Sequence, residues 1–105
     1  PDALRDRIID AQSKVVVTAD ASYRGEKMVA LKENVDNAIE PLADLVKHVI
    51  VVERAKADIN WQAKRDIWYH EAMAKSAAEC AVEKVAANHP LFILYTSGST
   101  GKPKG

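Results

Sequence analysis

The chain has 105 residues, which is enough for one small hydrophobic core. Hydrophobic residues make up 48% of it, a share typical of globular proteins that excludes a disordered tail. Fifteen basic and fifteen acidic residues cancel to a net charge of zero, so we expect neither nucleic acid nor a membrane surface as a partner. The apolar runs are too short for a membrane span, and the single cysteine, Cys80, predicts a reducing, cytoplasmic setting.

The beginning of the chain predicts a helix, a strand and a loop, in that order. Apolar residues at helical spacing mark the helix, with an aspartate placed to cap it: Leu4, Ile8 and Ala11 after Asp2. The β-branched run 14–18 predicts a strand that ends in a polar turn at Asp20. The charged stretch 23–27 then predicts a short loop.

A second, shorter helix is predicted in the middle of the chain. Apolar residues at helical spacing between 35 and 42 mark it, and Pro41 should end it near Glu40. The apolar run 48–52 that follows is typical of a strand.

The last third predicts one long helix and a final strand. From residue 62 to residue 87 nearly every residue favours helix, without glycine or proline, and Asn88 and Pro90 close the stretch. The apolar run 91–94 predicts a buried strand.

Strands that alternate with helices predict an α/β fold, in which flanking helices cover a layered sheet of largely parallel strands. The strands are apolar without alternation, which favours a sheet covered on both faces. We expect residues 1–105 to form part of a domain that is incomplete at both ends.

The stretch 95–105 has the composition of a phosphate site. Glycines let backbone N–H groups turn inward, hydroxyls donate further hydrogen bonds, and lysine ammonium groups neutralise charge. A flexible linker is a weaker interpretation, because an apolar run leads directly into the loop and a proline interrupts it. The motif of the P-loop NTPases fails on spacing, since only two residues separate Gly98 from Gly101-Lys102.

The same stretch, Tyr-Thr-Ser-Gly-Ser-Thr-Gly-Lys-Pro-Lys-Gly, resembles the phosphate-loop signature of the acyl-adenylate-forming enzymes at every position. The resemblance implies that the chain belongs to the large N-terminal domain of such an enzyme. It also implies that the loop binds the β- and γ-phosphates of ATP, with Mg²⁺ accompanying the nucleotide. The residues assigned to this role are Thr96, Ser97, Gly98, Ser99, Thr100, Gly101, Lys102, Pro103, Lys104 and Gly105.

Segments upstream of the loop resemble acetyl-CoA synthetases, in the same order along the chain: 4–10, 13–20, 31–36, 61–62 and 65–70. This branch implies acetate, ATP and coenzyme A as substrates, with AMP, pyrophosphate and acetyl-CoA as products formed through acetyl-adenylate. The acyl pocket and the lysine that drives adenylation in this family lie outside the chain. We therefore expect no catalytic residue within it, and no activity without the remainder of the parent protein.

The resemblance also implies a loop that binds coenzyme A, formed by Arg24, Gly25, Glu26 and Lys27. Two cations on either side of a glycine can approach the 3′-phosphate of the adenosine end, and an arginine can bind it through two parallel hydrogen bonds. Relatives more often have a second arginine where Lys27 stands, and lysine keeps the charge but loses the fork. A solvated surface turn with incidental charges is the alternative interpretation of the same residues.

Two alternatives stay open. A propionyl-CoA or other short-chain acyl-CoA synthetase shares the loop and differs in the acyl pocket, which lies outside the chain. A non-catalytic nucleotide-binding module with the same α/β segment is the alternative from another class.

The remaining polar and aromatic residues predict structural roles. The three histidines lack metal-ligand spacing, so no metal site is expected from side chains of this segment. Cys80 is predicted to be a buried small side chain, and three aromatic residues are predicted to be packing anchors: Trp61, Trp68 and Tyr69. The charges at 53–54 and 64–66 are interpreted as solvated.

Overall fold

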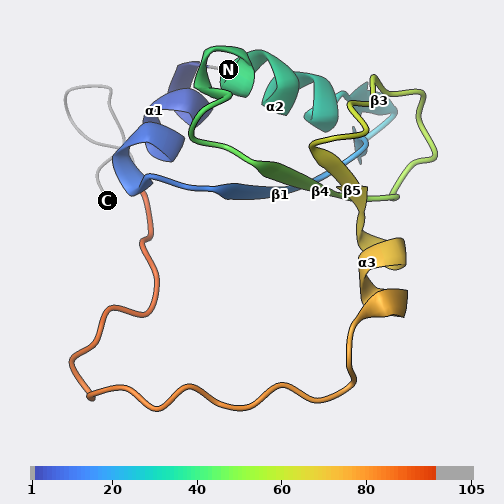
Figure 1. Cartoon of the computed structure of the whole chain (residues 1–105). Coiled ribbons are helices and arrows are strands. Elements are labelled where there is room, and N and C mark those ends of the chain that lie inside the picture. The colour runs from blue at the N-terminus through green and yellow to red at the C-terminus, as the bar shows by residue number, and fades with distance from the viewer. Residues whose placement is uncertain (1, 97–105) are drawn as a thin grey trace.

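The computed structural model describes residues 2–96 (Figure 1). Its elements are α1 (Asp2–Ala11), β1 (Val15–Ala19), β2 (Ser22–Arg24), β3 (Lys27–Val29), α2 (Leu31–Ile39), the short 3₁₀ helix η1 (Glu40–Leu42), β4 (His48–Val52), β5 (Asp66–Trp68) and α3 (Tyr69–Lys75). Among these residues, no helix has the length and apolar character needed to cross a membrane.

A three-stranded parallel sheet in the order β1-β4-β5 forms the centre of the fold. Val15 pairs with His48 at one end of β1 and Ala19 pairs with Val52 at the other, while β4 and β5 pair from Val49–Asp66 onward. The predicted α/β architecture with parallel strands is therefore confirmed. The carboxyl ends of all three strands meet at one edge of the sheet, which is where α/β proteins place their ligands.

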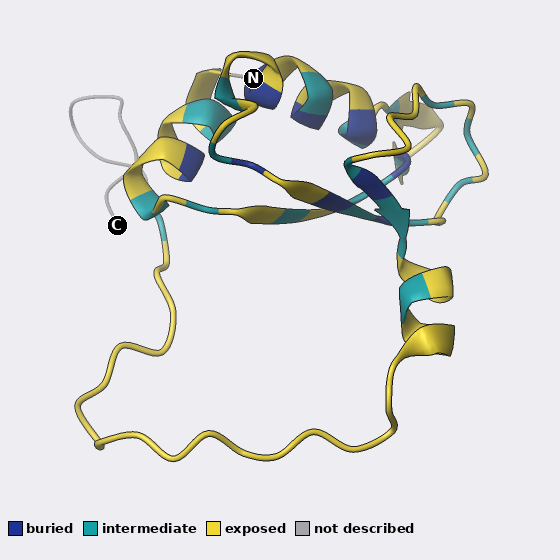
Figure 2. Ribbon diagram, in the orientation of Figure 1, coloured by how far each residue is buried: buried dark blue, intermediate teal, exposed yellow. Residues whose placement is uncertain are grey.

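Helices α1 and α2 lie side by side on one face of this sheet (Figure 1). The buried residues of both helices face the strands, as the dark blue segments of Figure 2 show. The core consists of Ile8, Val35, Ala38, Ile39, Val46, Val49 and Val51. Both predicted helices are confirmed, because their apolar stripes have a sheet to pack against.

The opposite face of β1 is open. Val15 and Val17 are 46% and 63% exposed, whereas Val16 between them packs against the core. The expectation of cover on both faces is wrong for this strand within residues 2–96. An uninterrupted apolar run did not distinguish a doubly covered strand from one that is covered on a single face.

Arg5 fixes the end of α2 against α1. Its Nε donates to the carbonyl oxygen of Ala38 at 2.8 Å, and its Nη2 donates to that of Asn37 at 2.9 Å. These carbonyls belong to the last turn of α2, where partners within the helix run out and a cation is favourable. The helix ends at Ile39, one residue from the predicted end, and Pro41 is the second residue of the 3₁₀ helix that follows.

The long helix predicted for residues 62–87 is wrong. The stretch instead contains β5, which pairs with β4, and α3, which ends at Lys75. Residues 76–95 contain no helix or strand. Helix propensity alone is a weak force, and most helical stability comes from a packed face that this exposed stretch lacks.

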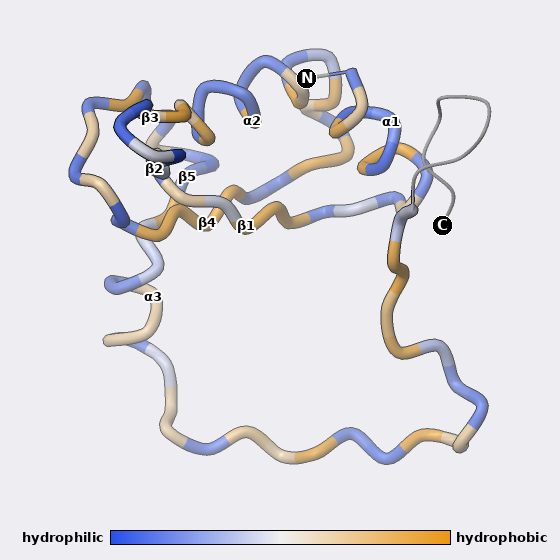
Figure 3. The backbone as a smooth tube through the Cα atoms, turned by 180° about the vertical axis from the view of Figure 1, so that it is seen from behind, coloured by the Kyte–Doolittle hydropathy of each residue, from blue (hydrophilic) through white to orange (hydrophobic). Residues whose placement is uncertain are grey.

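The predicted buried strand at 91–94 is also wrong. All four residues are exposed, from Ile93 at 57% to Leu91 at 88%. Figure 3 shows this apolar stretch shortly before the end of the described chain. Cys80 is exposed as well, which corrects the expectation that it is buried.

Candidate functional site

The stretch predicted to be a charged loop is the turn of a β-hairpin. Strands β2 and β3 are antiparallel, and Arg24 pairs with Lys27 across the two-residue turn Gly25-Glu26. Gly25 has φ +65°, and Glu26 is not among the residues with positive φ. A positive φ at the first central position only is the pattern of a type II′ turn, which favours glycine there. The strands were missed because their charged residues resembled a solvated loop.

The hairpin presents two cations side by side. Residues directly opposite in an antiparallel pair share one face of the ribbon, so Arg24 and Lys27 project in the same direction. Both side chains are exposed, and neither forms an ion pair with any residue between 2 and 96. Like charges in this arrangement repel one another, and an anion between them removes that cost. The arrangement is suited to a phosphate group.

Asp20 holds the base of the hairpin, at the carboxyl end of β1. Its side chain is buried, and the residue as a whole is 1% exposed. The carboxylate accepts hydrogen bonds from the backbone N–H groups of Arg54 at 2.8 Å, Ala55 at 3.1 Å and Ala57 at 2.9 Å. One side chain thereby fixes the loop that follows β4 to the end of β1.

The hydrogen bonds also set the acidity of Asp20. Burial alone raises the pKa of this carboxyl, but the backbone N–H groups of Arg54, Ala57, Ala21 and Ala55 outweigh it and lower the pKa from 3.8 to about 2. Asp20 is therefore ionised at neutral pH. Backbone N–H dipoles stabilise its charge, and no cation pairs with it within residues 2–96.

Lys32, the second residue of α2, is the second buried charge near the hairpin. Its ammonium group lies 2.8 Å from Asp36 Oδ1 and 3.0 Å from Asp66 Oδ2, and it donates to the carbonyl of Asn60 at 3.0 Å. Arg65 completes the group through contacts of 2.6 Å with Asp36 and 2.7 Å with Asp66. We call these four residues (Lys32, Asp36, Arg65 and Asp66) the buried charge cluster.

The cluster is internally neutral, with two cations and two anions. Burial raises the pKa of Asp66, but hydrogen bonds from Arg65, from the N–H of Gln62 and from Lys32 lower it below its ordinary value. Burial lowers the pKa of Arg65, and the hydrogen bond and charge of Asp66, with the charge of Asp36, raise it again beyond its ordinary value. The interpretation of 64–66 as solvated charges is thus wrong for Arg65 and Asp66.

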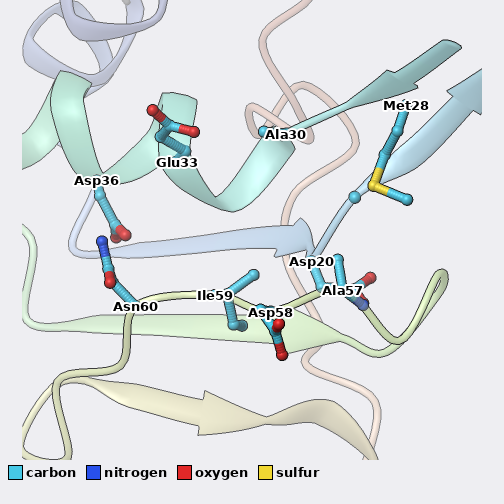
Figure 4. Close-up of a pocket in the computed structure, with 10 residues that line it drawn as sticks. Asp20, Met28, Ala30, Glu33, Asp36, Ala57, Asp58, Ile59 and Asn60 are labelled. Carbon is cyan, nitrogen blue, oxygen red and sulfur yellow. The ribbon is translucent and has the colours of Figure 1, made fainter.

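A cavity of about 250 Å³ lies at the carboxyl edge of the sheet, between the hairpin and the segment 57–60 (Figure 4). Met28 contributes from β3, while Glu33 and Asp36 contribute from α2. The other lining residues are Asp20, Ala21, Ala30, Ala57, Asp58, Ile59 and Asn60. Glu33 and Asp58 form no ion pair within residues 2–96 and make the cavity a poor phosphate site, so an anion is expected at the exposed turn of the hairpin and not beneath it.

Of the predicted phosphate-loop residues, Thr96 is described and is exposed. Ser97, Gly98, Ser99, Thr100, Gly101, Lys102, Pro103, Lys104 and Gly105 lie outside the described residues. Tyr95, which opens the motif, contacts α1: its hydroxyl donates to Asp10 Oδ2 at 2.6 Å, and the Arg7 guanidinium lies 5.9 Å from the ring centroid. The hydrogen bond to Asp10 raises the pKa of Tyr95.

The structure does not bring Thr96 and the hairpin together. Tyr95 lines a cavity with Val15 at the start of β1, whereas the hairpin follows Ala19 at the end of the same strand. Tyr95 and the hairpin therefore lie toward opposite ends of β1. Within residues 2–96, no group of three or more potential metal ligands is present.

Two of the aromatic residues predicted to be packing anchors, Trp61 and Trp68, form a stack. Trp61 and Trp68 have ring centroids 4.6 Å apart, and His70 stacks on Trp68 at 5.6 Å. Trp68 packs against the core, while Trp61 and Tyr69 are 37% and 45% exposed. The anchor role is therefore confirmed for Trp68 and holds in part for Trp61, whereas exposed Tyr69 has no stacking contact within residues 2–96.

Comparison with known proteins identifies relatives along the whole chain. The family model described as "AMP-binding enzyme" matches residues 1–105. The acetyl-coenzyme A synthetase of Alkalilimnicola ehrlichii is 58% identical over 105 residues, and acetyl-coenzyme A synthetase 2 of Pseudomonas aeruginosa is 56% identical over 105 residues. Each match covers 100% of this chain and 16% of the relative, so the chain spans about a sixth of the length of these proteins.

We predict that the stabilising contribution of Asp20 depends on pH. Its pKa is lower in the folded chain, so the contribution is complete above the ordinary value of 3.8 and is lost as the pH falls toward about 2. The difference in free energy of unfolding between the wild-type chain and Asp20→Asn should therefore shrink over this range. Urea unfolding of both chains at several pH values measures it. A difference that stays constant from pH 5 to pH 2 would contradict the low pKa.

Proposed function

The chain belongs to the AMP-binding enzyme family, and we propose that it is part of the N-terminal domain of a cytoplasmic, AMP-forming acetyl-CoA synthetase. The identity of more than half of all residues to proteins of that name supports this proposal. In the proposed reaction, an acetate oxygen attacks the α-phosphorus of ATP and expels pyrophosphate. The coenzyme A thiolate then attacks the acetyl carbon of acetyl-adenylate, forms the thioester and releases AMP.

We propose that residues Thr96–Gly105 bind the phosphates that leave as pyrophosphate. Thr96, Ser97, Ser99 and Thr100 offer hydroxyl donors, and Lys102 and Lys104 offer positive charge. Donors of this kind stabilise the charge that develops on a leaving group. Mg²⁺, when bound with ATP, neutralises further phosphate charge.

The hairpin is proposed to bind the 3′-phosphate of coenzyme A. The observation that carries this proposal is the pair Arg24–Lys27, which holds two exposed cations opposite one another with no described counter-ion. Coenzyme A carries its 3′-phosphate at the end remote from the thiol, so an anchor there fixes the molecule without interfering with the reacting group.

We predict that the full-length protein releases AMP from ATP only when both a carboxylate and coenzyme A are present. Acetate, propionate and butyrate should be compared at equal concentrations, and acetate is expected to give the largest kcat/KM. A preference for propionate or butyrate would establish a different short-chain acyl-CoA synthetase. No AMP release with any of the three would favour a non-catalytic nucleotide-binding module.

A Lys102→Ala variant of the full-length protein should lose adenylation selectively. We expect acetate-dependent exchange between ATP and pyrophosphate to fall by roughly 100-fold, the usual cost of one charge-stabilising donor. Formation of acetyl-CoA from supplied acetyl-adenylate and coenzyme A should stay near the wild-type rate, because no pyrophosphate leaves in that step. Lys84→Ala, at an exposed position outside both proposed sites, is the matched control. Equal loss in both half-reactions would contradict the assigned role.

An Arg24→Ala variant should lose affinity for coenzyme A and keep adenylation. We expect the KM for coenzyme A to rise roughly 10- to 100-fold, since a charge-assisted hydrogen bond contributes about 1.5–3 kcal/mol. Exchange between ATP and pyrophosphate should not change. Dephospho-coenzyme A, which lacks the 3′-phosphate, should bind the variant and the wild type equally. Lys47→Ala, an exposed cation just before β4, serves as the control.

A further inference from the structure

The hairpin has few contacts of its own with the rest of the fold. Tyr23, Arg24, Lys27 and Met28 are exposed, and the cavity of about 250 Å³ separates the hairpin from the segment 57–60. Figure 2 shows the same distribution, with buried residues near the sheet and helices. The position of the turn must therefore be set where the hairpin begins and ends.

Both ends of the hairpin are fixed by a buried charge. Asp20 lies two residues before β2, and Lys32 lies three residues after β3. The two residues are 1% and 0% exposed. The backbone N–H of Lys32 donates to the carbonyl oxygen of Asp20 at 3.2 Å, which closes the ribbon at its base.

The two charged side chains bind the same stretch of chain. Asp20 accepts from the N–H groups of residues 54, 55 and 57, and Lys32 donates to Asn60 O and contacts Asp66. Both ends of the hairpin are therefore attached to the connection between β4 and β5. A hydrogen bond to a charged group contributes more than one between neutral groups, and burial excludes competing water.

We infer that Asp20 and Lys32 are positioning residues for coenzyme A binding, which act through the hairpin by holding Arg24 and Lys27 in register with the site. This inference rests on the proposed function of the hairpin. Neither residue touches the ligand in this assignment. A loss of either anchor leaves the cations in place on the ribbon but lets the ribbon move as a unit at its base.

Kinetics of the full-length protein test this inference with Asp20→Asn and Lys32→Gln. Each variant should raise the KM for coenzyme A about five- to tenfold, a smaller effect than that of Arg24→Ala because both cations stay on the ribbon. Exchange between ATP and pyrophosphate should stay unchanged. In an Arg24→Ala background, where Lys27 alone still depends on the anchors, each substitution should raise this KM by a smaller factor, and with dephospho-coenzyme A neither should have any effect. Asp58→Asn, an exposed carboxylate in the same region, is the matched control.

Amide hydrogen exchange separates a failure of this inference from a failure of the proposed function. Faster exchange at residues 22–29 in Asp20→Asn or Lys32→Gln supports positioning, whether or not Arg24 binds coenzyme A. An unchanged KM in Arg24→Ala would overturn the proposed function of the hairpin. If both anchor variants leave amide hydrogen exchange at residues 22–29 and the KM for coenzyme A unchanged, the positioning role is overturned. Loss of folded protein, or of adenylation together with thioester formation, in both variants would show that the anchors support the domain as a whole, which also overturns it.

Discussion

The buried charge cluster is the constraint on which the rest of this structure depends. Removing an ammonium group and a carboxylate from water costs several kcal/mol for each, and the cost is recovered only if every charge finds partners with good geometry. Lys32 and Asp66 satisfy this condition at 3.0 Å, with Asp36 and Arg65 completing the neutral group. Loss of one charge leaves its partner buried and uncompensated, which typically lowers the free energy of unfolding by about 3–5 kcal/mol. The cluster therefore restricts how α2 and β5 can be placed relative to one another.

This restriction fixes the carboxyl edge of the sheet. The connection between β4 and β5 contains thirteen residues without helix or strand, 53–65, and it has few apolar side chains to bury. Its conformation is held by polar contacts: Asp20 binds its first part, and the buried charge cluster binds its end. Charged groups hold this connection in place, whereas apolar packing holds the sheet against α1 and α2, where Val49 and Val51 are fully buried.

The spacing of apolar residues predicted the helices and strands that pack an apolar surface into the core. The helical spacing of Leu4 and Ile8 and the apolar run 48–52 predicted α1 and β4, because the apolar residues of both elements contribute to the same core. Sequence could not identify β5, since three residues within a helix-favouring stretch become a strand only through pairing with β4. Nothing in the sequence around Arg65 and Asp66 indicates burial, because their partners Lys32 and Asp36 are about thirty residues away along the chain. The resemblance supplied the residues of the hairpin, but the pairing of Arg24 with Lys27 and the buried anchors appeared only in three dimensions.

The position of the hairpin is itself an argument about how coenzyme A binds. Tyr95 contacts α1 near the start of β1, and the hairpin follows its end, so about 16 Å of strand lies between Tyr95 and the hairpin at roughly 3.3 Å per residue. Coenzyme A is long, with its 3′-phosphate at one end and its thiol at the other, so a charged anchor at the hairpin leaves the thiol free to reach chemistry elsewhere. The anchor does not need to be buried for this purpose. An exposed pair of cations binds and releases a phosphate readily, provided that its base is rigid, and a rigid base is what Asp20 and Lys32 supply.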